Sequence, residues 1–171
     1  MSEGFDVLRV ANFVIDTAKD EKKELTNLKL QKILFFLQGF YLHTYDKRLI
    51  DGSFSKWQYG PVEKDAYNYF KFSGSAQLID DAFEFSTDSF KITPIPPISE
   101  KDFDSNAFIE LKNVLESLLN IPTWRLVELT HKDKSWADYR EEIGSYSAAD
   151  YTDDQIKECY SNSLKDLDIR K

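Results

Sequence analysis

Apolar residues recur every three or four positions at the start of the chain, up to a run of charged residues at positions 19–24. This spacing predicts a helix that ends near residue 20. Thr26 can cap a second helix, with Leu25 and Leu30 as the apolar pair that braces its first turn. Since every residue from Ile33 to Leu37 is apolar, we expect this second helix to run through the centre of the fold. The positions that define the first helix are Val7, Leu8, Ala11, Val14, Ile15 and Ala18.

Several residues of the second helix depart from its apolar pattern, among them Gln31, Lys32 and Gly39. Gln31 and Lys32 could form a polar site, but their place near the start of the helix favours a solvated end whose side-chain stems pack on apolar neighbours. Gly39 costs about 1 kcal/mol relative to alanine within a helix. We interpret it as a point where another element can approach closely.

The segment after this helix combines a strand signal with a turn signal. The segment 53–59 is too short for a helix and rich in aromatic residues, which favours a short extended strand. Gly60 suits a helix cap, and Pro61 suits the first helical position, where its φ is favourable and its missing N–H is not needed. We therefore predict that a helix begins at Pro61 and ends at residues 73–74.

Period-two alternation between residues 76 and 96 predicts a small antiparallel sheet or hairpin, which the proline-rich positions 94–97 end. Ser99 and Asp102 resemble a helix-starting box for a helix that reaches Asn120. A short helix is then expected over residues 122–131.

A capping box formed by Thr152 and Gln155 predicts the last helix. Together these elements predict an α+β fold that is mostly α-helical, a compact helical domain with a small antiparallel β-sheet or hairpin. No repeat or long linker divides the chain, so we expect a single domain over residues 1–171. That length can bury a core without disulfides or metals.

The composition narrows the function classes. The net charge of -8 argues against broad binding to phosphate backbones, so nucleic acid is an unlikely partner and a basic protein is a better one. No apolar run approaches the roughly 20 residues of a membrane span, and the N-terminus lacks the pattern of a signal peptide. With a single cysteine, Cys159, the chain is expected to be cytoplasmic, without a membrane association.

One cluster could support catalysis. His131 lies close in sequence to Asp133 and Asp138, as a base with an orienting carboxylate would in a small hydrolase. However, no nucleophile motif accompanies it, and two histidines in the whole chain make a zinc site very unlikely. We therefore favour a structural role for His131, as a helix cap that bonds a carbonyl, and predict no catalytic residue, metal or cofactor.

Three segments taken together and in order resemble the Panacea domain family, which includes SocA-like antitoxins and phage-associated proteins. They are the run from Leu25 to Phe36, the run from Trp57 to Val62, and the Leu-Thr-His sequence at 129–131 with Trp136 after it. One position departs from the family pattern, since Ser135 stands where proline is expected. The motif residues are Leu30, Gln31, Lys32, Leu34, Trp57, Tyr59, Gly60, Pro61, Val62, Leu129, Thr130, His131 and Trp136.

The resemblance implies an antitoxin that neutralises a co-encoded protein toxin by direct binding, and it implies no catalysis. The alternative is a proteolytic adaptor that delivers the toxin to an AAA+ protease. Toxins paired with the family are diverse and include membrane-acting peptides and alarmone-synthetase-like enzymes that modify tRNA, so the resemblance does not identify the partner.

Two expectations concern where these residues lie. The motif residues Leu30, Leu34, Trp57, Tyr59 and Leu129 are expected to form one core cluster. Exposed aromatic residues between Trp57 and Tyr69 and the acidic segment after Asp138 are expected to form the partner-binding face, because aromatics are enriched in interfaces and carboxylates attract a cationic partner. That face comprises Trp57, Tyr59, Tyr67, Tyr69, Asp138, Glu141 and Glu142.

Overall fold

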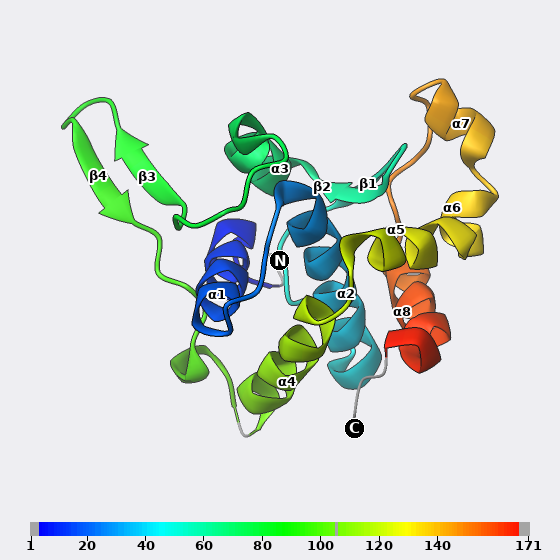
Figure 1. The fold of residues 1–171 in the computed structure, drawn as a ribbon, viewed down its shortest axis with the longest axis horizontal. Coiled ribbons are helices and arrows are strands. Elements are labelled where there is room, and N and C mark those ends of the chain that lie inside the picture. Colours follow the sequence, from blue (N-terminus) through cyan, green and yellow to red (C-terminus); the bar gives the residue numbers. More distant parts are fainter. Residues whose placement is uncertain (1–3, 105, 168–171) are drawn as a thin grey trace.

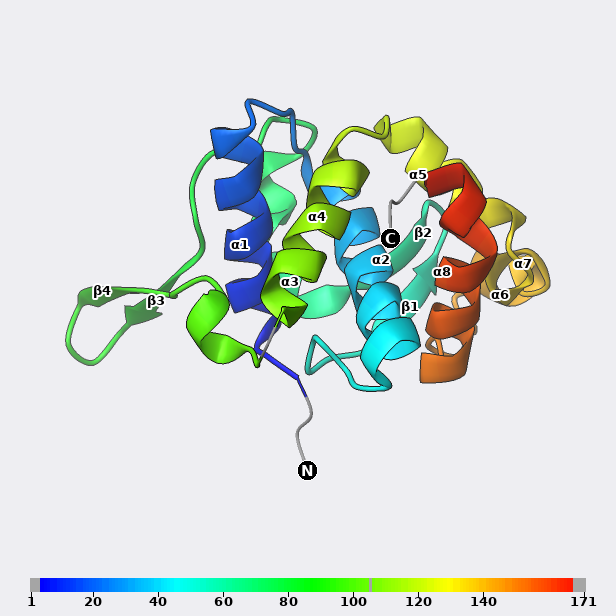
Figure 2. The same cartoon turned by 90° about the horizontal axis from the view of Figure 1, so that it is seen from below.

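The body of the molecule is a row of long helices in a computed structural model that describes residues 4–104 and 106–167. Helix α2 (Asn27–Tyr45) lies between α4 (Ala107–Leu119) and α8 (Asp153–Leu167), with α1 (Val7–Asp20) on the far side of α4 (Figure 2). The predicted class, α+β and mostly α-helical with small antiparallel strand pairs, is confirmed. The shorter elements are β1 (Phe54–Trp57), β2 (Gly60–Glu63), α3 (Lys64–Phe70), η1 (Lys71–Ser73), β3 (Phe83–Ser86), β4 (Lys91–Pro94), η2 (Glu100–Asp102), α5 (Thr123–Lys132), α6 (Lys134–Ala137) and α7 (Arg140–Gly144).

Helix α2 is central, as its apolar run predicted, and is buried along most of its length. Thr26 caps it by accepting a hydrogen bond from the backbone N–H of Lys29 at 3.2 Å. Gly39 marks the crossing with α8, because a Cβ there would lie 2.6 Å from the Cβ of Tyr160. The predicted close approach is therefore confirmed.

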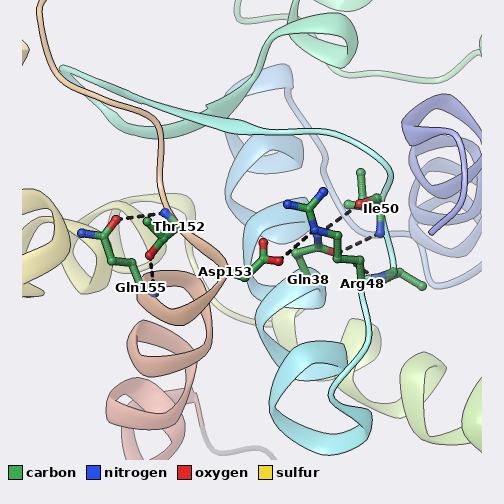
Figure 3. Close-up of polar contacts among 7 residues, drawn as sticks. Gln38, Arg48, Ile50, Thr152, Asp153 and Gln155 are labelled. Carbon is green, nitrogen blue, oxygen red and sulfur yellow. Dashed lines mark hydrogen bonds and ion pairs between the residues drawn. The ribbon is translucent and has the colours of Figure 1, made fainter. Parts of the chain in front are cut away.

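Polar side chains fasten the middle of the loop between α2 and β1 (Figure 3). Gln38 Oε1 accepts from the backbone N–H groups of Leu49 at 2.9 Å and Ile50 at 2.8 Å, so a buried amide replaces the backbone partners that the loop lacks. Arg48 Nε lies 2.9 Å from Asp153 Oδ2 in the first turn of α8.

The start of α8 has the capping box that the sequence predicted (Figure 3). Thr152 N donates to Gln155 Oε1 at 3.0 Å, and Gln155 N donates to Thr152 Oγ1 at 3.1 Å. The predicted box at Ser99 and Asp102 starts only the single turn η2, and α4 begins later, at Ala107.

The prediction that a helix begins at Pro61 is wrong, because residues 60–63 form strand β2, which pairs with β1. Trp57 lies opposite Gly60, and Gln58 and Tyr59 form the turn between them. Gly60 has a φ of 103°. It closes a hairpin, a role that positive-φ glycines commonly have, and does not cap a helix. Helix α3 begins at Lys64, capped by the Glu63 carboxylate, which accepts from Ala66 N at 2.8 Å.

The second hairpin, β3–β4, confirms the predicted period-two segment and projects from the body as an arm (Figure 1). Every residue of both strands is exposed. Asn12 of α1 holds the base of the arm: its amide donates to the carbonyls of Ala82 and Ile95, both at 2.9 Å, and accepts from Ala82 N at 2.7 Å. The arm and α7 lie at opposite ends of the molecule in both views.

Candidate protein-binding site

The backbone of the β1–β2 hairpin is held by polar side chains from α2, α5 and α6. Gln31 Oε1 accepts from Glu63 N at 2.9 Å, and Lys32 Nζ donates to Pro61 O at 3.0 Å. Trp136 Nε1 donates to Trp57 O at 2.8 Å. The motif segments, far apart in the sequence, therefore meet at one place and fix the position of one hairpin.

Lys32 and Gln31 are buried, with exposed fractions of 0% and 1%, so the expectation of a solvated helix end is wrong. Sequence spacing could not show this, since the hairpin that covers them is itself built from a distant segment. Burial lowers the pKa of the Lys32 ammonium from 10.5 to about 7. Pro61 O is the one hydrogen-bond acceptor that the described residues supply to it. An amine with three donors is therefore only partly satisfied.

Gly60 is the point where the hairpin rests on these side chains. A Cβ at Gly60 would lie 2.7 Å from Thr130 Oγ1 and 2.9 Å from Lys32 Cε. The Thr130 hydroxyl is itself fixed, because it donates to Val127 O at 2.7 Å. Glycine is thus required here both by its positive φ and by the close packing against α2 and α5.

His131 packs flat on Trp136, with ring centroids 3.9 Å apart and an angle of 17° between the planes. Burial lowers the pKa of His131, a hydrogen bond with the Gln58 backbone raises it, and the charges of Lys32 and Arg140 lower it further. Thus His131 contacts the same hairpin, which fits the structural role predicted for it.

The carboxylate that a hydrolase would need is engaged elsewhere. Asp133 Oδ1 accepts from both the backbone N–H and the hydroxyl of Ser135, at 3.0 and 2.6 Å. Among the described residues, no hydrogen bond or ion pair joins His131 to Asp133 or Asp138. The cap on Ser135 also fixes the loop at the position where the family pattern has proline.

The tip of the hairpin points away from these contacts and forms part of an apolar surface. Tyr59 is 60% exposed, Leu28 at the start of α2 is 40% exposed, and Trp124 at the start of α5 is 68% exposed. All three line one depression of about 700 Å³. We call Leu28, Tyr59 and Trp124 the tip patch. Large exposed aromatics in a concave surface are typical of the residues that dominate protein–protein affinity.

A larger groove of about 1170 Å³ adjoins the tip patch, since Leu28 and Tyr59 line both hollows. Its walls come from the start of α2, from the hairpin, from α3 and from the α6–α7 segment. Trp57 and Tyr67 form one wall, with ring centroids 4.9 Å apart in an edge-on arrangement. Trp136 and Arg140 lie on the side of α6 and α7.

The structure brings only part of the predicted partner-binding set together. Trp57, Tyr59 and Tyr67 line the groove, whereas the hydroxyl oxygen of Tyr69 accepts a hydrogen bond from Phe83 N beside the arm. The three acidic members, on or just before α7, are exposed and do not line the groove. They are Asp138, Glu141 and Glu142.

The predicted motif core is right for three leucines and wrong for one aromatic. Leu30, Leu34 and Leu129 are fully buried, Trp57 is half-buried, and Tyr59 is exposed because it lies in the turn of the hairpin.

Sequence reasoning also missed the exposure of Trp124. The signal was present, since the buried Leu126 and Leu129 are three positions apart and place Trp124 on the opposite face of the helix.

Two negative findings hold for the part of the chain that the structure describes. No group of three or more His, Cys, Asp or Glu side chains is arranged to hold a metal ion. No helix combines the length and the apolar composition needed to cross a bilayer.

Comparison with known proteins identifies the family. A protein-family model described as Antitoxin SocA-like, Panacea domain matches residues 30–137. The chain belongs to this family. The matched region runs from α2 to the end of α6 and contains the hairpin. In this Panacea domain it also contains Gln31, Lys32, His131 and Trp136, whose side chains contact the hairpin backbone.

Among curated proteins, the chain is similar to Antitoxin SocA of Caulobacter vibrioides (strain NA1000 / CB15N), with 27% identity over 129 residues. The match covers 75% of this chain and 66% of the length of SocA. No solved structure matches the chain.

Proposed function

We propose that this Panacea domain is an antitoxin that neutralises a co-encoded protein toxin by forming a stoichiometric complex with it, without catalysis. The observation that carries the proposal is how the matched region uses its side chains. Its polar motif residues hold the hairpin backbone, and Tyr59 at the tip of that hairpin and Trp124 at the start of α5 remain exposed. A rigid scaffold that presents exposed aromatics is suited to binding a protein.

Further support comes from the relative, because SocA is named an antitoxin. A binding function also agrees with the contacts of His131, which stacks on Trp136 and bonds the hairpin backbone. We place the protein in the cytoplasm on the sequence features described above.

The direct test is to mix the purified chain with the product of the adjacent gene. Sequestration predicts that toxin activity falls to zero at equal concentrations, and that cells lacking their cytosolic AAA+ proteases are still protected. A proteolytic adaptor would give the opposite pattern. Neutralisation would then require the protease, and the toxin would persist longer in its absence.

His131→Ala separates binding from chemistry. If His131 is structural, the variant loses stability and neutralisation together, and lower temperature restores both. A variant that folds normally and binds the toxin with unchanged affinity, yet fails to neutralise it, would favour the hydrolase alternative.

A further inference from the structure

The charge of the large groove is opposite to that of the whole chain. The protein has a net charge of -8, yet the described residues that line the groove include five bases and one acid, Asp150. The bases are Lys32, Lys56, Lys64, Lys71 and Arg140. Such a local concentration of positive charge favours an anionic ligand even on an acidic protein.

None of these bases has a carboxylate partner in the described part of the chain. The ammonium groups of Lys32 and Lys56 each donate to a neutral oxygen, on Pro61 and Gln155 respectively. Asp150, the acid in the lining, accepts from the Ser55 hydroxyl at 3.0 Å. The positive charge exposed in the groove lies on Lys64, Lys71 and Arg140, and among the described residues no ion pair compensates it.

The bases nearest the walls lie against aromatic rings. The guanidinium of Arg140 is 5.5 Å from the centre of the Trp136 ring, and the ammonium of Lys71 is 5.4 Å from that of Phe72. Lys64 is exposed at the start of α3. Such contacts hold a cation loosely and leave it free to meet a carboxylate.

The size and distribution of these groups favour an extended chain over a compact ligand. The volume of about 1170 Å³ exceeds the roughly 300–1,000 Å³ typical of small-molecule sites. The bases lie on five elements, α2, β1, α3, η1 and α7, so their charges are spread along the groove. Carboxylates spaced along a peptide match this spread better than the clustered charges of one phosphate group.

We propose that the groove receives an acidic segment of the partner polypeptide that also carries a large apolar side chain. The acidic residues meet Lys64, Lys71 and Arg140, and the apolar side chain packs between the rings of Trp57, Tyr67 and Trp136. This inference rests on the proposed antitoxin function and identifies the part of the toxin that the domain recognises. The complex would then contain two kinds of charge pairing, because the exposed carboxylates on α7 remain available to basic residues of the same partner.

The test reverses two groove charges, with Lys64→Glu and Arg140→Glu combined. Each lies at the first position of its helix, where a carboxylate is favourable, so the double variant is expected to fold. Lys112→Glu on α4 is the matched control, since Lys112 is exposed and does not line the groove. Calorimetric titration with the co-encoded toxin should show binding weakened at least tenfold by the double variant and unchanged by the control. Equal affinity for the double variant and the wild type would overturn the proposal while leaving the antitoxin function intact.

A second measurement does not depend on the toxin. A short synthetic peptide containing Asp, Glu, Phe and Leu should change the fluorescence of the tryptophans that line the groove, and the same peptide with Lys in place of the acids should not. The double variant should abolish the response. If the toxin fails to bind the wild type but the acidic peptide binds, the antitoxin proposal fails and the groove proposal stands. Binding of ATP or pyrophosphate without binding of the acidic peptide would instead identify a phosphate site and overturn the inference.

Discussion

The two β-hairpins have strands of equal length but opposite surroundings. In β1–β2, every strand residue except Trp57 is buried, and side chains of α2 and α6 form hydrogen bonds with the backbone. In β3–β4, all strand residues are exposed, and the contacts that fix the arm gather at its base, around Asn12. The first hairpin is therefore shaped by the rest of the fold, whereas the second depends on its own pairing.

The two hairpins show why some exposed aromatic residues are better suited than others to bind a partner. Tyr59 and Trp124 are exposed on a rigidly held scaffold, so this protein loses little conformational entropy when a partner binds them. Phe85 and Phe90, which are 55% and 80% exposed, belong to a two-stranded arm, and such hairpins are only marginally stable by themselves. We therefore propose that the toxin binds at the tip patch and not at the arm.

The largest expected difference between the hairpins comes from removing one phenylalanine from each. Phe54 in β1 is fully buried and packs edge-on against Phe35, with ring centroids 5.5 Å apart. Phe54→Ala should lower the free energy of unfolding by about 3–5 kcal/mol, whereas Phe85→Ala should change it by less than about 0.5 kcal/mol. Urea denaturation measures both values. Similar losses for the two variants would show that the arm is part of the folding core.

A pair of glycines separates backbone strain from close packing. Gly60 and Gly74 both have positive φ, but an added Cβ would meet Thr130 and Lys32 at Gly60 and nothing within 4 Å at Gly74. Gly74→Ala should cost about 2 kcal/mol, the cost of the backbone conformation alone, because a φ of 56° with a ψ of -123° is strained for a residue that has a Cβ. Gly60→Ala should cost about 3 kcal/mol, because the clash adds to that strain. Equal thermal shifts for the two variants would mean that the hairpin is not seated on Lys32 and Thr130 as described.

Lys32→Met tests the buried ammonium through the pH dependence of stability. The pKa of Lys32 is about 7 in the folded state and 10.5 as its ordinary value, so the unfolded chain binds more protons between these limits. The wild type should therefore gain up to about 1.4 kcal/mol per pH unit, relative to the variant, as the pH rises from 7 towards 10. Parallel stability curves for the two proteins would show that Lys32 titrates as an exposed lysine does.

The smallest effect is expected at the base of the arm. Burial, a hydrogen bond with Asp81 and repulsion from its charge together raise the pKa of Asp16 to about 7. The folded state thus binds more protons than the unfolded chain between pH 4 and pH 7, so stability falls as the pH rises through that range. Because Asp16 is partly solvated, Asp16→Asn should reduce this fall by no more than about 1 kcal/mol. A fall of the same size in the variant would assign it to other carboxylates.

Local signals predicted the parts of the fold whose partners are near in sequence. The Thr26 cap, the Thr152 and Gln155 box and the arm all form as expected, because each depends on residues within a few positions or on alternation along one strand. The prediction of a helix at Pro61 is wrong because the structure there depends on residues that are distant in the sequence. Its glycine and proline satisfy helix-start rules, but contacts with α2 and α5 select the hairpin.

The candidate site was predictable in its residues but not in its arrangement. The motif resemblance identified Gln31, Lys32, His131 and Trp136, yet no local pattern shows that all four contact one hairpin. Composition could not predict the basic groove, because the net charge of -8 is a sum over the whole chain and does not show that several bases lie together in the fold. A single domain over residues 1–171 remains a prediction.

The central claim is that the held hairpin presents the toxin-binding face. The most direct measurement is the dissociation constant for the co-encoded toxin, determined for the double variant Tyr59→Ala and Trp124→Ala and for the matched double variant Phe85→Ala and Phe90→Ala. All four side chains are well exposed, so both proteins should unfold at the wild-type temperature. We predict that the first variant binds at least about 30-fold more weakly, as loss of a dominant contact would require. The second should bind within about twofold of the wild type, since it leaves the tip patch intact. Wild-type affinity for the first variant, together with a large loss for the second, would contradict the claim and place the toxin on the arm.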